Sequence, residues 1–162
     1  MKKNLILLLL NSALLILNSA CLAQQTKIDS LLNLLKKDKP DTNKVIHSNK
    51  LCWEFGRIGL YDSAIFYGNY AMQLSQQLNF KKGIANSSNN IGNMYLGQNN
   101  YPLALNHFLK ALKLHEELQN KNGIVSNLSN IGIVYWNKGD YNKALDYYFK
   151  ALKSIPLFYR VL

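Results

Sequence analysis

Acidic residues, cysteine and histidine are scarce in this sequence, and each shortage excludes a class of protein. Nine Asp and Glu stand against 19 Lys and Arg in 162 residues, so carboxylate pairs suited to acid–base catalysis are few. The two cysteines cannot build a disulfide scaffold, and Cys52 is alone if Cys21 leaves with a signal peptide. The three histidines share no metal-ligand spacing and are expected on helix surfaces, at His47, His107 and His115.

Sequence motifs that carry chemistry are missing as well. The sequence has neither a glycine-rich phosphate loop nor a nucleophile elbow, so it predicts no enzyme, no cofactor and no metal site. The formal net charge of +10 is high, but lysines such as Lys110, Lys113, Lys150 and Lys153 are spread at helical spacing without aromatics between them on that face. We expect a solvated basic surface and a protein or peptide partner, not nucleic acid.

The first 23 residues read as a secretory signal peptide, cleaved after Ala23. Residues 1–4 are basic, residues 5–17 form an apolar run shorter than the roughly 20 residues of a membrane span, and small residues follow. The alternative is a lipoprotein modified at Cys21, because Leu17-Asn18-Ser19-Ala20-Cys21 resembles a bacterial lipobox whose Leu stands one residue too early. We expect an exported protein of the periplasm or cell envelope, at a membrane only through Cys21 or as part of a membrane sensor.

An amphipathic helix is predicted directly after the signal peptide. Its apolar residues at Ile28, Leu31, Leu32 and Leu35 follow the i, i+3, i+4, i+7 spacing of one helical face. We expect the helix over residues 27–37, ended by Pro40, with Asp41 or Thr42 capping the next helix. Residues 24–43 are therefore predicted to be an N-terminal helix and linker that covers the exposed apolar face of the next helices in the chain.

The centre of the sequence is a repeat with a period of 40 residues. Residues 101–112 recur at 141–152 and, more weakly, at 61–72, and a fixed period of this size indicates a solenoid. Each copy carries a tyrosine, two alanines and an aromatic residue on one helical face. In the three copies these are Tyr61, Ala64, Gly68 and Ala71; Tyr101, Ala104, Phe108 and Ala111; and Tyr141, Ala144, Tyr148 and Ala151. The first copy has Gly68 in place of the aromatic, which predicts looser packing there.

Glycines recur with the same period on the preceding helices. Gly92 and Gly132 lie inside helical patterns, where glycine costs about 1 kcal/mol relative to alanine, so we expect that only a hydrogen fits where each helix meets its partner. Cys52 occupies the same register and is predicted to be a small buried side chain. Gly83 and Gly123 are expected at helix C-termini, with the next helix starting one residue later.

These residues resemble the tetratricopeptide repeat. The family pattern of a small residue, a Tyr and Ala-x3-aromatic-x2-Ala is met by Gly132, Tyr135, Ala144, Tyr148 and Ala151, with Pro156 closing the unit. The resemblance covers about residues 45–156. The usual period is about 34 residues, so a period of 40 marks a longer-helix variety, similar to the repeats of kinesin light chains and to exported proteins and sensor regions of Bacteroidetes-type bacteria.

The resemblance implies an all-α fold, an α-solenoid of three helix pairs wound as a right-handed superhelix, with an N-terminal capping helix. The array is expected over residues 44–156, in units of about 45–80, 85–120 and 125–156, followed by an aberrant apolar tail at 157–162. It further implies a non-catalytic scaffold that binds a peptide or protein segment in its concave groove. The alternative is the N-terminal sensor fragment of a bacterial signalling protein such as a two-component histidine kinase.

The resemblance also implies which residues line the groove. Concave positions of the first helix of each pair correspond to Asn49, Trp53, Arg57, Asn86, Asn89, Asn93, Ser126, Ser129, Ile133, Trp136 and Asn137. Asn90 and Asn130 share one register two residues before the glycines. Asparagine both donates and accepts, so a row of them can hydrogen-bond a ligand backbone. The other interpretation is that Asn90 and Asn130 tie adjacent repeats together.

Overall fold

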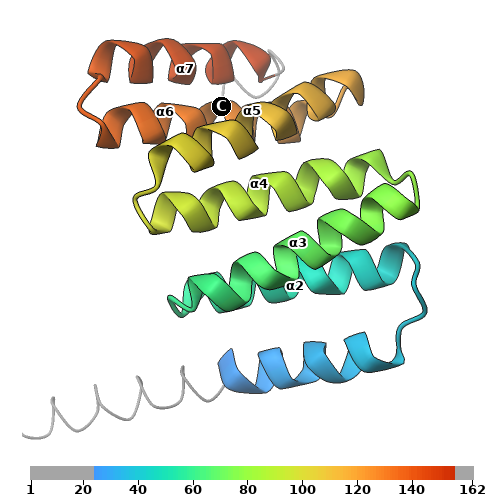
Figure 1. Cartoon of the computed structure of the whole chain (residues 1–162). Coiled ribbons are helices and arrows are strands. Elements are labelled where there is room, and N and C mark those ends of the chain that lie inside the picture. The colour runs from blue at the N-terminus through green and yellow to red at the C-terminus, as the bar shows by residue number, and fades with distance from the viewer. Residues whose placement is uncertain (1–23, 156–162) are drawn as a thin grey trace, which may run out of the picture.

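The computed structural model describes residues 24–155. The predicted signal peptide, Cys21 and the apolar tail lie outside the described residues. A helix over residues 24–37 is followed by α2 (Thr42–Arg57), α3 (Tyr61–Gln77), α4 (Lys81–Gly97), α5 (Tyr101–Glu117), α6 (Lys121–Asn137) and α7 (Tyr141–Ser154). Figure 1 shows these helices stacked along one axis, with residues 24–37 at one end and α7 at the other. The predicted all-α solenoid of three helix pairs is confirmed.

Turn residues and side-chain caps set the helix boundaries. Asp41 accepts hydrogen bonds from the backbone amides of Asn43 and Lys44 and starts α2, as predicted. Asn100, Asn120 and Asp140 cap α5, α6 and α7 in the same way. Between the helices the chain turns through residues with positive φ, which are Gly59 (76°), Asn79 (52°), Asn99 (58°), Gln119 (52°) and Gly139 (78°).

The expectation that Gly83 and Gly123 end helices is wrong. Both lie in the first turn of a helix, since α4 begins at Lys81 and α6 at Lys121. The left-handed residues of these turns are Asn79 and Gln119. Space, not backbone conformation, requires the glycines: a Cβ on Gly123 would run into the ring of His115.

The glycines inside α4 and α6 are where helices of a pair approach closely, as predicted. A Cβ on Gly92 would lie 2.7 Å from two ring atoms of Phe108, and one on Gly132 would lie 2.5 Å from the ring of Tyr148. Phe108 is completely buried by this arrangement. In each of these two pairs an aromatic side chain on the second helix therefore lies over a glycine on the first.

The first helix pair reverses these sizes. Cys52 is fully buried on α2, as expected of a small side chain, and Gly68 lies opposite it on α3. The predicted looser packing at Gly68 is wrong, because Ile91 of α4 fills the space and would lie 2.7 Å from a Cβ there. Burial raises the pKa of the Cys52 thiol to about 12, so this thiol is unreactive in the folded protein.

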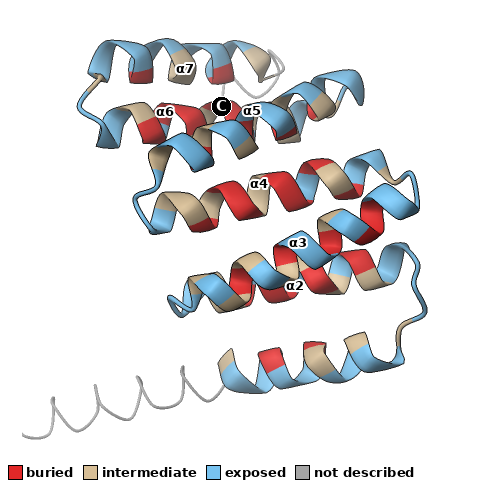
Figure 2. Ribbon diagram, in the orientation of Figure 1, coloured by how far each residue is buried: buried red, intermediate tan, exposed pale blue. Residues whose placement is uncertain are grey.

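The helix at residues 24–37 packs on α2 through Ile28 and Leu31, which are 2% and 7% exposed and contact Leu51. Adding the 40-residue period to 24–37 gives 64–77, which lies within α3. The N-terminal helix therefore has the register of the second helix of a preceding pair. Figure 2 shows its buried residues on the side that faces α2.

The histidines are less exposed than expected. His115 is only 2% exposed, so its predicted surface position is wrong. Burial, and to a smaller extent the charge of Lys82, lowers the pKa of His115 below its ordinary value of 6.5. Burial and then Lys110 lower the pKa of His107 in the same direction. Neither histidine belongs to a metal-binding cluster, and none of His, Cys, Asp and Glu forms one within residues 24–155.

Hydropathy gives no membrane span in the described region. Among residues 24–155, no helix is both long enough and apolar enough to cross a bilayer.

Candidate peptide-binding groove

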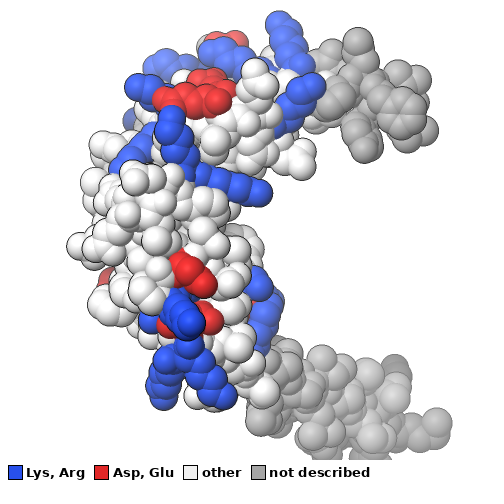
Figure 3. Space-filling model, turned by 90° about the vertical axis from the view of Figure 1, so that its right-hand side faces the viewer, with Lys and Arg blue, Asp and Glu red and all other residues white. Residues whose placement is uncertain are grey.

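The array is curved into a crescent that is hollow on one side, as Figure 3 shows. Lys and Arg side chains border the hollow above and below, and its inner wall is mostly uncharged. A cavity of about 890 Å³ opens between residues 24–37, α2 and α4, a volume within the range of ligand sites in proteins.

Five of the predicted groove residues line this cavity. They are Asn49, Trp53, Asn86, Asn89 and Asn90. Trp53 is 48% exposed, so its ring offers a flat apolar surface to a ligand. Asn86 is exposed as well. The structure therefore brings together the predicted residues of the first two helix pairs, with apolar wall residues between them.

The asparagines also join neighbouring repeats. Asn90 Nδ2 donates to Asn49 Oδ1 at 3.2 Å, and Asn130 Nδ2 donates to Asn89 Oδ1 at 3.0 Å. Asn49 in turn donates to Ser87 Oγ at 3.0 Å. The interpretation of Asn90 and Asn130 as ties between repeats therefore matches the geometry. Asn86 makes no side-chain hydrogen bond within residues 24–155 and keeps both its donor and its acceptor for a ligand.

The remaining predicted residues lie elsewhere and do not line this cavity. Arg57 is bound to Glu54 at the end of α2, with Nη1 and Oε2 3.3 Å apart. Trp136 is 53% exposed and packs edge-on against Tyr141, with ring centroids 4.9 Å apart. The others belong to α4 or α6 outside the cavity wall: Asn93, Ser126, Ser129, Asn130, Ile133 and Asn137.

Sequence reasoning missed three lysines and the wall formed by the N-terminal helix. Lys27, Lys50 and Lys82 reach the cavity from residues 24–37, α2 and α4. Their spacing in the sequence is that of an ordinary solvated face, which gave no sign of a shared cavity. The position of the N-terminal helix could have been found, because Ile28 lies 80 residues, or two periods, before the buried Phe108.

A buried carboxylate holds the N-terminal helix in place. Glu54 on α2 is 3% exposed, and its carboxylate forms ion pairs with Lys27 and Arg57. Gln24 Nε2 donates to Glu54 Oε2 at 2.7 Å. A buried charge needs such partners, because an unpaired one loses its hydration without compensation. Lys27 and Gln24 therefore fix the position of the helix that forms one wall of the cavity.

Comparison with known proteins bears out the fold. A family model described as tetratricopeptide repeat matches residues 83–155. No curated protein matches the sequence significantly. Several solved structures are similar in fold at 20–22% identity.

The similar structures differ in how much of their length the chain spans. BtubC (BKLC) from P. vanneervenii is 21% identical with a TM-score of 0.65, over 71% of this chain and 48% of that one. The tetratricopeptide-repeat domain of Arabidopsis FLU is 20% identical with a TM-score of 0.64, over 69% and 94%. A Rap protein solved in complex with Competence and Sporulation Factor is 20% identical with a TM-score of 0.71, over 81% and 36%. The chain thus spans about half of BtubC and about a third of the Rap protein. Residues 83–155 are tetratricopeptide repeats in sequence, and helices α2–α7 form a tetratricopeptide-type solenoid in fold.

Proposed function

We propose that this protein is an exported, non-catalytic scaffold that binds a peptide or an extended protein segment in its concave groove. The observation that carries the proposal is the cavity between residues 24–37, α2 and α4, where Trp53 and Asn86 are exposed beside a wall of apolar side chains. An exposed aromatic ring beside free amide groups suits a peptide, since the ring contacts a side chain and the amides bond the backbone.

Similarity in fold gives further support. Tetratricopeptide repeats generally act as binding scaffolds, and one similar structure, the Rap protein, was solved with a bound factor. Within residues 24–155 no cluster of His, Cys, Asp and Glu is arranged for metal chemistry. Export rests on the signal-like first 23 residues.

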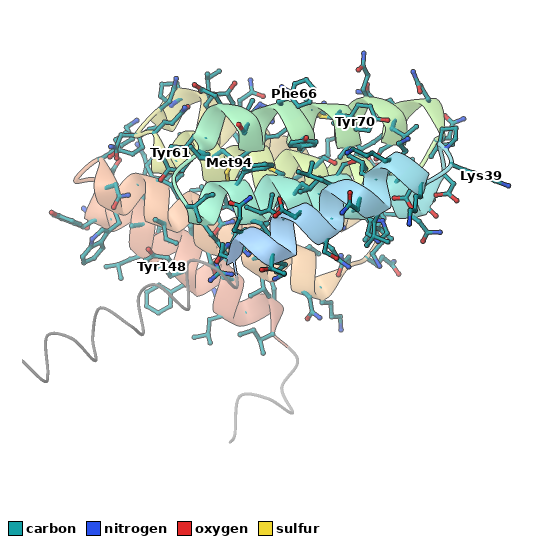
Figure 4. The ribbon with its side chains drawn as sticks, turned by 90° about the horizontal axis from the view of Figure 1, so that it is seen from below. Lys39, Tyr61, Phe66, Tyr70, Met94 and Tyr148 are labelled. Atoms are coloured by element: carbon teal, nitrogen blue, oxygen red, sulfur yellow. The ribbon has the colours of Figure 1, made fainter. Side chains whose placement is uncertain are left out.

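Selection from a random peptide library, followed by fluorescence anisotropy with the selected peptides, tests the groove. The variant Trp53→Ala/Asn86→Ala removes two exposed groups of the cavity. The matched control Phe66→Ala/Asn106→Ala removes an exposed aromatic ring and an exposed amide from the second helices α3 and α5, where Figure 4 shows Phe66 pointing outward. We expect a loss of at least about tenfold in affinity for the groove variant, which corresponds to about 1.4 kcal/mol. Equal affinities of the two variants would refute the assignment of the groove.

The mass of the mature N-terminus tests export. Cleavage after Ala23 leaves Gln24 as the first residue, whereas lipidation leaves a diacylated or triacylated Cys21 at the N-terminus. An N-terminus that still carries residues 1–20 in the mature protein would refute both forms of the proposal.

The sensor region of a signalling protein is the second candidate. It is favoured by α7, on which Tyr141 and Leu145 are 55% and 47% exposed. Their counterparts on α5, Tyr101 and Leu105, pack against the core that α6 helps to form. The α7 surface thus resembles one that a further helix covers. Reading the DNA beyond the codon for Leu162 in all three frames tests this candidate: a further repeat followed by a kinase-like region supports it, and no such frame removes it.

A further inference from the structure

The cavity between residues 24–37, α2 and α4 has an uneven balance of charge. Lys50 and Lys82 line it from two different helices, and both are exposed. Within residues 24–155 neither lysine forms an ion pair. The one carboxylate of the lining, Glu54, is already bound by Lys27 and Arg57. The cavity therefore presents two uncompensated positive charges.

Resting on the proposed peptide groove, we propose that this cavity takes an acidic segment of a partner protein and that the bound segment holds the N-terminal helix against the array. Lys50 and Lys82 receive the carboxylates of the segment. Trp53 and Ile46, which are 48% and 43% exposed, contact its apolar side chains. Asn86 bonds its backbone. Salt bridges that are partly shielded by the cavity walls are stronger than pairs on an open surface.

The apolar lining favours a protein segment over nucleic acid. Val45, Ile46, Trp53 and Phe80 contribute to the wall, and a phosphate backbone gains nothing from contact with aliphatic side chains. Nucleic-acid binding draws most of its affinity from many phosphate contacts along a basic track, whereas this cavity offers two free lysines. An acidic segment with interspersed apolar residues matches both the charges and the wall.

The site is shared between the N-terminal helix and the array. Lys27, Ser30 and Leu31 form one wall, while α2 and α4 form the others. A ligand that contacts both sides binds only when the helix is docked, so its binding free energy adds to the stability of the docked state. The Glu54 cluster keeps the helix docked in the absence of ligand.

The test uses two labelled six-residue peptides on the full chain, one alternating Glu and Leu and the other alternating Gln and Leu. We expect the Glu–Leu peptide to bind at least about tenfold more tightly, because only it carries charge complementary to the lysines. K50Q/K82Q should abolish this preference. The matched control K113Q/K153Q removes the same charge from α5 and α7, outside the cavity lining, and should change the affinity by about twofold or less.

Each other outcome overturns a stated part of the proposal. If both peptides bind equally and both depend on Trp53, the acidic preference is wrong and the groove of the proposed function stands. If K113Q/K153Q weakens binding as much as K50Q/K82Q, the attraction belongs to the net charge and not to the cavity. If a single-stranded DNA oligonucleotide binds more tightly than the Glu–Leu peptide and loses this affinity in K50Q/K82Q, the ligand class is nucleic acid.

Amide hydrogen exchange tests the link to the N-terminal helix. Saturation with the Glu–Leu peptide should slow exchange over residues 28–35 by about tenfold or more, and leave α7 unchanged. Unchanged exchange over residues 28–35 at full occupancy would overturn the link between ligand and helix while leaving the acidic preference in place.

Discussion

Replacement of Gly92 by alanine tests the close approach that organises each helix pair. A methyl group at Gly92 would lie 2.7 Å from two ring atoms of Phe108, closer than carbon atoms approach without displacement. Phe108 is fully buried, so its ring has no solvent to move into. Gly132 provides the comparison, because the facing Tyr148 is only half-buried and can rotate outward. Figure 4 shows Tyr148 near the edge of the molecule.

Two opposing effects set the size of the change. Alanine gains about 1 kcal/mol over glycine inside a helix, and overpacking of a rigid core costs about 1–3 kcal/mol. For Gly92→Ala the packing cost dominates, and we expect a net loss of about 1 kcal/mol in the free energy of unfolding. For Gly132→Ala the ring relaxes and the gain in helix propensity remains, so we expect no loss. The two substitutions should differ by about 1–2 kcal/mol.

Urea denaturation followed by circular dichroism measures both variants, with the slope compared to ensure that only the midpoint moves. The double variant Gly92→Ala/Phe108→Leu removes the ring atoms that the methyl group meets. It should be more stable than the sum of the single changes, with a coupling of about 0.5–3 kcal/mol. A Gly92→Ala variant as stable as the parent, or a coupling near zero, would show that Phe108 does not confine this position.

Three further predictions concern buried polar groups. Glu54→Ala should raise the exchange rate of amides over residues 28–35 and cost about 1–2 kcal/mol, a figure reduced because Lys27 is 57% exposed; unchanged exchange would mean that Glu54 does not hold the helix. The lowered pKa values of His107 and His115 mean that both are neutral when folded, so thermal stability is full above the ordinary pKa of 6.5 and falls as the pH drops below it; a flat melting temperature from pH 7 to 5 would contradict this. The thiol of Cys52, with its pKa near 12, should react with iodoacetamide only at the unfolding rate in a Cys21→Ser background, and rapid labelling of the native chain would refute its burial.

Local sequence patterns were enough to predict the architecture. The 40-residue period, the alanines at 0% exposure and the mid-helix glycines all specify contacts within one pair or with the next. Each unit repeats the same local solution, so a pattern read once applies along the whole array. This is why the helix pairs, the close approach at Gly92 and the burial of Cys52 were predicted correctly.

The errors and omissions concern contacts that cross between units. Gly68 is packed by Ile91, which belongs to the next pair, and His115 is buried against the start of α6. The cavity combines Lys27, Lys50 and Lys82, which lie on three helices and share no local spacing. By itself the sequence determined the helices, their pairing and the small residues that permit it, because these depend on neighbours at fixed separations. Only the tertiary structure decided which polar side chains face one another across repeats, since that depends on the curvature of the array and on how the N-terminal helix docks against it.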